Sequence, residues 1–380
     1  MRTPRIAIVG GGLSGLSGLY AAYLLQQQGI GDYVLFEARE TTGGRILSTS
    51  GQETAANGSV NGLDRFDLGP TWFWPDIQAE LDSVIRDLGI ARFEQHQTGD
   101  MLVERSHDQA PVRVHGYTNE PVSMRLVGGM AALTDALAAE LDENSIITGE
   151  AVRGLRLGAH NVEVRSEDSA GLARTTCVDH VLLALPPRLA EATVRFEPPL
   201  PAAFAQQWGG TPTWMAPHAK YVATYKAPFW REMGLSGEAR SARGPLGEIH
   251  DASMEGGSAA LFGFFGVPAN VRRNVPEAAL RAHCRSQLAR LFGPLAATPE
   301  ADFIKDWARD PYTATGDDYD GSSPHLGVAP VNAPPGPWQA FVTSIASEWS
   351  RQFPGYVAGA IEAARIGVEA LAARYRRTLT

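Results

Sequence analysis

Three glycines near the start of the chain have the spacing needed to hold a diphosphate. In the stretch GGGLSGLSGLY, one reading frame fits the pattern G-x-G-x-x-G, at Gly10, Gly12 and Gly15. The first glycine permits a tight turn, the second lets backbone approach phosphate oxygens, and the third lets a helix pack closely on a strand. A helix that begins here would direct its unpaired N–H groups and positive dipole end at the same oxygens. The spacing therefore predicts a diphosphate site at a strand-to-helix turn.

A carboxylate follows at the distance expected for a ribose contact. The apolar run RIAIV precedes the glycines, and an Ala- and Leu-rich helix with Gly29 as its C-cap follows them. The β-rich run DYVLFE then ends at Glu37, and an acid about 20 residues after the last glycine can accept a hydrogen bond from a ribose 2′-hydroxyl. Together these parts form one βαβ unit and predict a dinucleotide site. The acid disfavours a 2′-phosphate, so FAD or NAD is favoured over NADP.

Composition excludes several classes of protein. The 380 residues suffice for two domains or one large one, and 44% hydrophobic with 20% charged residues is typical of a globular protein. A net charge of −9 argues against nucleic acid or an anionic membrane as partner. Cys177 and Cys284 lie far apart, so we expect a cytoplasmic protein with neither disulfides nor a metal site. The apolar stretches are too short for a signal peptide or a membrane span.

Alternating strands and helices predict an α/β fold. Helices are expected at 77–92, 128–141, 277–293 and 355–375. The continuous apolar run 181–185 is typical of a strand covered on both faces, and residues 145–187 are interpreted as a β-meander that ends on it. The loop at 312–337, rich in Pro, Gly and Asp, is too long for a plain connection and indicates function.

Five segments, in this order, make the sequence similar to a known family. The runs RIAIVGGGLSG…LFEARETTGGR, LVGGMAAL, HVLLALPP, KYVATYKAPFWR and GYVAGAIEAA resemble flavin-containing amine oxidases of the monoamine oxidase-like family. The GGR run after the acid separates FAD proteins of this type from NAD dehydrogenases. The resemblance implies an α/β fold, with a Rossmann-type FAD-binding domain and an interleaved substrate domain of a mixed sheet plus helices. The expected FAD-binding domain is discontinuous, at 1–75, 123–200 and 330–380, and the substrate domain occupies 76–122 and 201–329.

The resemblance also assigns cofactor contacts residue by residue. The glycine motif would bind the pyrophosphate, Glu37 the adenosine ribose, and Arg45 would offer its guanidinium near phosphate or ribityl oxygens. The family's cysteine for covalent attachment has no counterpart in the loop at 312–337, so non-covalent FAD is expected. The full expected set is Gly10, Gly12, Gly15, Glu37, Arg39, Gly44, Arg45, Gly69, Pro70, Thr71, Trp72, Val152, Glu348, Tyr356 and Val357.

Two residues are implied to be catalytic. Lys220 matches the lysine that, in this family, holds a water against flavin N5, where a cation would stabilise negative charge on the reduced flavin. The alternative is a solvated strand lysine, and Lys226 lies nearby as a rival. Tyr356 matches one wall of an aromatic cage that steers an amine nitrogen, with packing at a helix start as the alternative.

The rest of the substrate pocket departs from the family's pattern. Trp307 would be a further pocket wall or a plain core residue. The second cage tyrosine is expected where ungapped counting reaches Asp317, whereas a two-residue insertion would supply Tyr319. A carboxylate there would suit a cationic or hydroxylated substrate. His250 and Asp251 could form a dyad, although structural roles are expected in that loop.

These observations lead to three functional hypotheses. The first is an FAD-dependent oxidoreductase that oxidises a small amine to an imine by hydride transfer to flavin N5, with O2 reoxidation giving H2O2. The second is an FAD-dependent dehydrogenase, desaturase or amino-acid oxidase using another acceptor, in which Arg231, Arg240 or Arg243 could bind a substrate carboxylate. The third is a flavoprotein without catalytic activity. The sequence contains no signal from which an oligomeric state follows.

Overall fold

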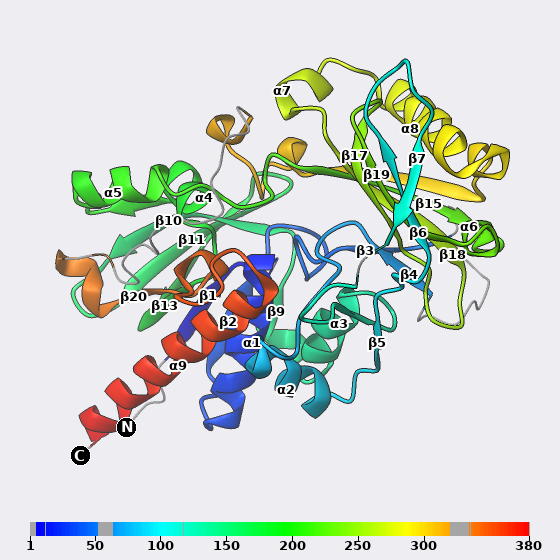
Figure 1. Cartoon of the computed structure of the whole chain (residues 1–380). Coiled ribbons are helices and arrows are strands. Elements are labelled where there is room, and N and C mark those ends of the chain that lie inside the picture. Colours follow the sequence, from blue (N-terminus) through cyan, green and yellow to red (C-terminus); the bar gives the residue numbers. More distant parts are fainter. Residues whose placement is uncertain are drawn as a thin grey trace. The chain divides into compact units, whose positions relative to one another are not determined.

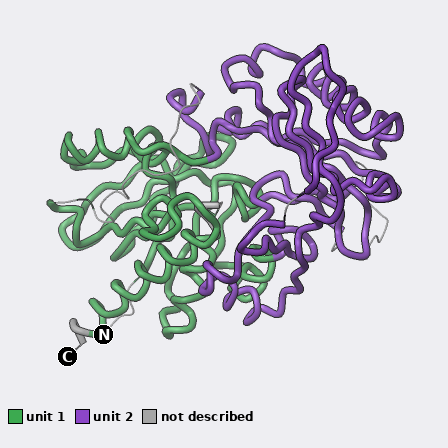
Figure 2. The backbone as a smooth tube through the Cα atoms, in the orientation of Figure 1, with its two compact units in different colours: residues 1–46, 133–214, 323–380 green, residues 47–132, 215–322 purple. Residues whose placement is uncertain are grey.

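The chain divides into two compact units, each built from segments that are far apart in the sequence (Figure 2). This computed structural model describes residues 5–11, 13–51, 64–116, 118–319, 334 and 336–379. Unit 1 consists of Met1–Ile46, Leu133–Trp214 and Ser323–Thr380, and unit 2 of Leu47–Ala132 and Met215–Ser322.

A five-stranded parallel sheet forms the centre of unit 1. Its strand order is β20-β13-β1-β2-β9, and each pair of neighbours is parallel. The predicted first strand, helix and second strand are confirmed, with Gly29 in the left-handed region at φ 74° after the helix. The strands are β1 (Ile6–Val9), β2 (Tyr33–Phe36), β9 (Ile146–Ile147), β13 (His180–Leu183) and β20 (Val342–Ser344).

Both faces of this sheet are covered (Figure 1). Helix α1 (Leu13–Gln27) packs on β1 and β2, and α9 (Val357–Leu379) packs on α1 and β20. Along each strand, successive side chains point to opposite faces of the sheet. Those of Val9 and Phe36 share a core with the indoles of Trp208, Trp338 and Trp349. Because both faces are buried, the strands read as continuous apolar runs rather than alternating ones.

A second, four-stranded sheet completes unit 1, in the order β12-β11-β10-β14. The meander predicted for 145–187 is therefore only partly right. The central strands β10 to β12 are antiparallel, but β9 pairs with β2 and β13 with β1 in the parallel sheet. The remaining elements are β10 (Glu150–Leu157), β11 (Val162–Asp168), β12 (Ala173–Val178), β14 (Arg195–Glu197), α4 (Pro187–Thr193), α5 (Ala202–Gly209), η1 (Glu143–Ser145), η5 (Gly336–Ala340) and η6 (Ser347–Trp349).

Unit 2 is organised around a seven-stranded mixed sheet of order β19-β15-β18-β17-β16-β6-β7. Neighbours in it are antiparallel except for β16 and β6, which are parallel. Its strands are β6 (Asp100–Glu104), β7 (Val112–His115), β15 (Ala219–Tyr225), β16 (Leu235–Ser241), β17 (Leu246–Asp251), β18 (Ala259–Phe265) and β19 (Ala301–Asp306).

The two faces of the mixed sheet bury different clusters. Tyr221, Ala223 and Tyr225 of β15 pack with helix α8 (Glu277–Phe292), whereas Val222 shares a cluster with Phe262 and Phe66 on the other face. Two short ribbons, four helices and three 3₁₀ turns complete the described part: β3 (Ser48–Ser50) with β4 (Arg65–Asp67), β5 (Arg92–Glu94) with β8 (Met124–Leu126), α2 (Ala79–Asp87), α3 (Ala131–Ala139, across the unit boundary), α6 (Phe229–Glu232), α7 (Ala269–Arg272), η2 (Pro294–Ala297), η3 (Trp307–Arg309) and η4 (Gly316–Asp318).

Within the described ranges, none of the helices combines the length and apolar character that crossing a bilayer requires.

Candidate functional site

The glycine turn connects β1 to α1 in unit 1. Gly10 has φ 111°, and its N–H donates to the Phe36 carbonyl oxygen at 2.9 Å. A Cβ at Gly10 would lie 2.9 Å from the Ala184 carbonyl oxygen, so both the backbone angle and the space demand glycine. Gly12 lies outside the described residues, and Gly15 lies in the first turns of α1.

A further glycine lets α1 approach the sheet. A Cβ at Gly18 would come within 2.2 Å of the Gly10 carbonyl oxygen and 3.3 Å of Ile8 Cγ2. Backbone cannot yield by that amount, so Gly18 performs the close packing that the motif assigns to its third glycine. Sequence reasoning missed this residue, although the repeat of Gly-Leu-Ser-Gly that contains it was the signal.

Glu37 directly follows β2, beside this turn. Its carboxylate is buried, and Oε1 accepts the Arg39 backbone N–H at 2.8 Å, with Arg39 Nη1 at 3.6 Å. Burial raises the pKa of Glu37 in spite of these contacts. The Gly43 N–H donates to the Gly11 carbonyl oxygen at 2.7 Å, which brings the GGR loop to the glycine turn. The acid, the turn and the loop predicted together are thus adjacent.

Arg45 follows this loop and is almost completely buried. Its Nη2 lies 3.1 Å from Glu348 Oε1 in η6, and its Nη1 donates to the Trp214 carbonyl oxygen at 3.4 Å. Gly44 precedes it with φ 53°. Val152, on β10, is buried in the same core as Phe36. Residues from four segments of the sequence therefore meet in unit 1.

An aromatic pair stands at the start of α9. Tyr356 is half-buried directly before the helix, whose first residue, Val357, is buried. The Tyr356 ring packs against Trp214 with centroids 4.4 Å apart and planes inclined by 43°. Trp214 was not among the predicted residues. Its signal is its place in PTWMAPHAK, just before the strand that carries Lys220.

The residues of unit 1 fit a dinucleotide. The first turn of α1 contains no acidic side chain that would repel a diphosphate, and a helix start leaves N–H groups without intrahelical partners. Within the described residues, the buried hydroxyls of Ser17 and Thr213 have no hydrogen-bond partner. Backbone donors, a buried arginine and the Glu37 carboxylate are the donor and acceptor set that a diphosphate and a ribose require.

Lys220 lies on β15 of unit 2 with only 2% of its surface exposed. Its Nζ donates to the Gly69 carbonyl oxygen at 3.2 Å and to Thr71 Oγ1, and it lies 3.9 Å from the centroid of Phe262. Burial lowers the pKa of Lys220 to about 7, although the nearby Asp67 carboxylate acts in the opposite direction. The alternative of a solvated lysine is wrong for this residue, whereas Lys226 is exposed.

The loop Gly69–Trp72 lies along the same region of unit 2. Besides the contacts from Lys220, the loop is held by Trp72 Nε1, which donates to Gln95 Oε1 at 2.8 Å. Thr71 is buried, and Gly69 and Pro70 are half-buried. Trp307 is buried beside the start of the loop, because its Nε1 donates to the Leu68 carbonyl oxygen at 3.0 Å.

The two candidates for the second cage wall lie in different surroundings. Asp317 is exposed in η4, whereas Tyr319 is half-buried with the Arg273 guanidinium 5.3 Å from its ring centroid. Residues 320–333 of the long loop lie outside the described residues. The expectation that one of the two completes a cage therefore stays a prediction.

The hypothesised dyad of His250 and Asp251 is wrong. The two residues are adjacent on β17, so their side chains point to opposite faces of the sheet. His250 Nε2 lies 2.7 Å from Glu248 Oε1, while Asp251 Oδ2 accepts from Trp230 Nε1 and Arg231 Nε at 2.8 Å each.

The three arginines considered for a substrate carboxylate are each paired with an acid of the chain. Arg231 binds Asp251, Arg240 binds Glu238 and Glu248, and Arg243 lies 3.4 Å from Glu104.

Comparison with known proteins places this geometry in a family. The model of the flavin containing amine oxidoreductases matches residues 104–372, and that of an NAD(P)-binding Rossmann-like domain matches residues 8–88. A putrescine oxidase from Kocuria rosea is 30% identical over 253 residues, which is 61% of this chain and 50% of the relative. An L-amino acid dehydrogenase from Synechocystis is 28% identical over 244 residues, 62% of this chain and 49% of the relative. The chain thus spans about half the length of these curated relatives.

Solved structures share the fold. A putrescine oxidase variant with redesigned cofactor binding has a TM-score of 0.76 at 20% identity, covering 98% of this chain and 99% of its own. A cyclohexylamine oxidase from Brevibacterium oxydans has a TM-score of 0.77 at 18% identity, covering 99% and 100%. The expected α/β fold with a Rossmann-like part is confirmed. Because the family model spans most of the sequence, the chain belongs to the flavin containing amine oxidoreductases, and FAD is its cofactor.

Proposed function

We propose that this protein oxidises a carbon–nitrogen bond of a small amine to an imine with non-covalently bound FAD. The observation that carries the proposal is the buried amine of Lys220, which lies on one face of the mixed sheet in contact with the loop Gly69–Trp72. The relatives named for the oxidation of putrescine and of cyclohexylamine support an amine as substrate.

Residues of unit 1 would hold the cofactor. The turn at Gly10 and the first turn of α1 would bind the diphosphate through backbone N–H groups, and Glu37 would accept a ribose hydroxyl. Arg45, fixed by Glu348, would offer its guanidinium to phosphate or ribityl oxygens. When bound, FAD accepts a hydride from the carbon next to the amine nitrogen.

Residues of unit 2 would act on the reacting end of the substrate. Lys220 holds its Nζ between the Gly69 carbonyl oxygen, Thr71 and the Phe262 ring, so the amine cannot move away to solvent. A charge fixed in so buried a position stabilises negative charge that develops beside it far more than a solvated lysine would. We propose Tyr356 and Trp307 as aromatic walls that orient the amine, and Asp317 or Tyr319 as the candidate for the second cage residue.

The electron acceptor separates two candidate reactions. We propose O2, which would yield H2O2. The similarity to an L-amino acid dehydrogenase favours a different acceptor or an amino-acid substrate as the second candidate. The ion pairs of Arg231, Arg240 and Arg243 argue against an amino acid as substrate. A guanidinium that already binds a carboxylate of the chain is not available to bind the carboxylate of a substrate.

Anaerobic mixing of the yellow holoprotein with a panel of primary amines and L-amino acids tests both candidates. We expect amines to bleach the flavin absorbance, and admission of air to restore it with one H2O2 per turnover. Reduced flavin that persists in air would favour the dehydrogenase, and bleaching by amino acids alone would replace the substrate class. Failure of every compound would contradict the proposed function.

A further inference from the structure

Trp214 contacts both Tyr356 and the glycine that precedes it. The two rings pack with their centroids 4.4 Å apart and their planes inclined by 43°. A Cβ at Gly355 would come within 3.0 Å of Trp214 Cβ and 3.1 Å of its Cε3, so the backbone before Tyr356 also lies close to Trp214. Gly355 has φ 82°, a conformation that glycine adopts readily and other residues rarely do. Trp214 therefore borders the Tyr356 ring and the residue that sets its backbone direction.

Arg45 holds the two segments that carry this aromatic pair. Its Nη1 donates to the Trp214 carbonyl oxygen at 3.4 Å, and its Nη2 lies 3.1 Å from Glu348 Oε1. Beside Glu348 in η6, the carbonyl oxygen of Ser347 accepts the Gly355 N–H at 3.2 Å. One buried guanidinium thus fixes the backbone at Trp214 and, through η6, the backbone at Gly355. The contact with Trp214 uses only its main chain, so the indole can be replaced without removing that contact.

The backbone directly after Trp214 is strained. Met215 has φ 63°, and among the residues that the structure describes it is the only non-glycine in the left-handed region. A side chain disfavours this region, and such strain persists only where the surrounding contacts impose it. Met215 also accepts the His218 N–H at 3.1 Å in the turn that leads to β15. Trp214 is thus held by Arg45 and followed by a strained turn.

The aromatic pair is not part of the hydrophobic core of unit 1. Trp214 and Tyr356 are each half-buried, whereas the core indoles have at most 2% of their surface exposed: Trp208, Trp338 and Trp349. A half-buried pair of rings stabilises a fold less than a buried pair, because it removes less apolar surface from water. Core packing therefore does not account for the strain and the close approach at Trp214, whereas a need to fix the Tyr356 ring does.

We propose that Trp214 is a positioning residue, which fixes the ring of Tyr356 in the orientation that aligns the substrate amine. Trp214 acts through Tyr356 and not on the reacting atoms. This inference rests on the proposed function, because it takes Tyr356 as a wall that orients the amine. A wall that turns away leaves most bound amines misaligned, so loss of Trp214 lowers kcat and leaves KM nearly unchanged.

A double-mutant cycle on the holoenzyme tests this role, with the primary amine of the panel that reduces the flavin fastest. Trp214→Ala should lower kcat about tenfold to hundredfold, as misplacement by about 1 Å does. Trp214→Phe keeps a ring against Tyr356 and should recover most of the loss. In a Tyr356→Ala background, Trp214→Ala should lower kcat by less than about twofold more, because the residue it positions is already gone. Equal effects in both backgrounds would overturn the inference.

Two controls separate positioning from loss of stability or of cofactor. Trp338→Phe trims an indole of the unit 1 core and should lower the Tm without changing kcat. Trp214→Ala should keep its ratio of flavin to protein absorbance, because the carbonyl oxygen at this position still accepts from Arg45. A fall in kcat that merely follows the loss of bound FAD would reduce Trp214 to a structural role and overturn the inference.

A measurement without substrate separates this inference from the proposed function. Fluorine NMR of protein labelled with 3-fluorotyrosine reports on the ten tyrosines, and Tyr356→Phe identifies the resonance of Tyr356. Trp214→Ala should shift and narrow that resonance, because the ring loses the adjacent indole and gains freedom. An unchanged resonance would overturn the inference even if amines are oxidised. If no amine is oxidised, the proposed function fails, and the resonance alone decides whether Trp214 fixes the Tyr356 ring.

Discussion

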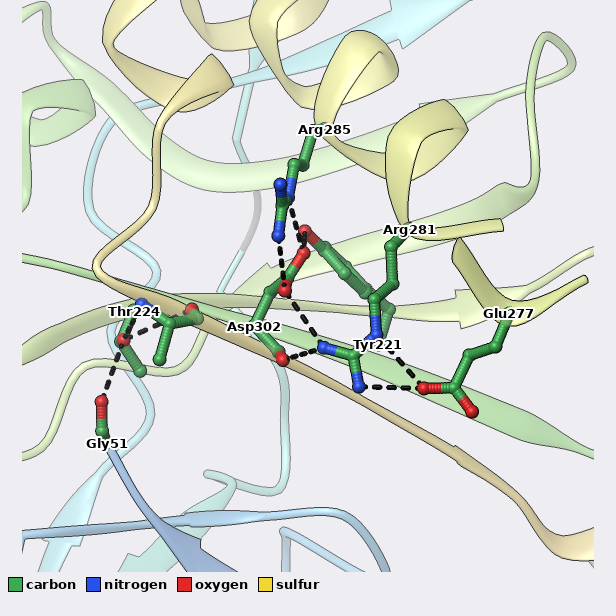
Figure 3. A network of polar contacts seen from close by, with 8 residues as sticks. Gly51, Tyr221, Thr224, Glu277, Arg281, Arg285 and Asp302 are labelled. Atoms are coloured by element: carbon green, nitrogen blue, oxygen red, sulfur yellow. Dashed lines mark hydrogen bonds and ion pairs between the residues drawn. The ribbon is translucent and has the colours of Figure 1, made fainter. Parts of the chain in front are cut away.

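Replacing Asp302 with asparagine should destabilise the sheet that positions Lys220. Asp302 lies on β19, 2% exposed, and its carboxylate accepts four hydrogen bonds (Figure 3). Arg285 Nε and Nη2 donate at 2.7 Å each, Tyr221 Oη at 2.8 Å and Arg281 Nη1 at 2.9 Å. Burial by itself raises the pKa of this carboxyl, but the hydrogen bonds from Arg285, Tyr221 and Arg281 outweigh it and hold the pKa below its ordinary value.

The size of the effect follows from what the substitution leaves behind. Asparagine keeps the shape but removes the charge, and its amide N–H2 faces groups that are themselves donors. Breaking a buried ion pair from one side costs about 3–5 kcal/mol. Because the side chains of Arg281 and Arg285 are 25% and 45% exposed, water recovers part of that loss. We therefore expect Asp302→Asn to lower the free energy of unfolding by about 3 kcal/mol and the Tm for unit 2 by about 6–12 °C.

Urea unfolding across a pH series measures this loss. The folded-state pKa of Asp302 is below the unfolded one, so its stabilisation is present above the ordinary pKa of 3.8 and is lost as the pH falls through the folded value. The gap between Asp302→Asn and the unmodified protein should narrow on acidification. Glu277→Gln removes a 53% exposed carboxylate from the same Arg281 and should cost less than about 0.5 kcal/mol. A loss for Asp302→Asn as small as that of this control, or one constant with pH, would refute the reasoning.

Three further substitutions have expected outcomes of different kinds. Burial lowers the pKa of Lys220 from 10.5 to about 7, so between these pH values the unfolded chain binds one proton more than the folded protein. The free energy of unfolding therefore rises with pH in this range. Lys220→Met should abolish that rise in urea titrations. Gly18→Ala should lower the free energy of unfolding by about 1–3 kcal/mol, measured by calorimetry, and should weaken FAD retention. As the control, Gly31→Ala places its added Cβ with no atom within 4 Å and should change neither quantity. Arg45→Met removes the ion-pair partner of the buried Glu348 carboxylate and should lower the free energy of unfolding in urea by about 3–5 kcal/mol. A second change, Glu348→Leu, should restore part of that loss, and no recovery would argue against the ion pair as the cause.

The sequence by itself predicted the parts of the molecule in which local signals agree. The first strand, α1 and β2 are read correctly because an apolar run, a glycine turn, a helix-forming segment and a second apolar run follow one another without interruption. The position of Glu37 beside the turn follows from the same contiguity, since a βαβ unit of this length brings the ends of its two strands together. The family was recognisable because its motifs are short, contiguous and ordered.

The pairing of strands from distant segments could not be predicted from the sequence. The apolar run of β13 predicts burial on both faces, but nothing in it specifies β1 and β20 as neighbours rather than the preceding meander. The His250–Asp251 hypothesis failed for a related reason. Adjacent residues on a strand face opposite ways, and the partner that shares a face with His250 is Glu248, two residues away.

What the sequence determined, then, is an α/β chain with a glycine turn and an acid after its second strand, because these are specified by residue types at short fixed spacings. The resemblance of its ordered motifs to a flavin-containing family added FAD and a candidate lysine. Only the tertiary structure decided that Lys220 is buried, that Arg45 is paired with Glu348, that Gly18 touches the backbone of the turn, and which faces of β15 and β17 carry their polar groups. These properties depend on contacts between segments separated by tens to hundreds of residues, and burial and charge are set by such contacts and not by neighbours along the chain.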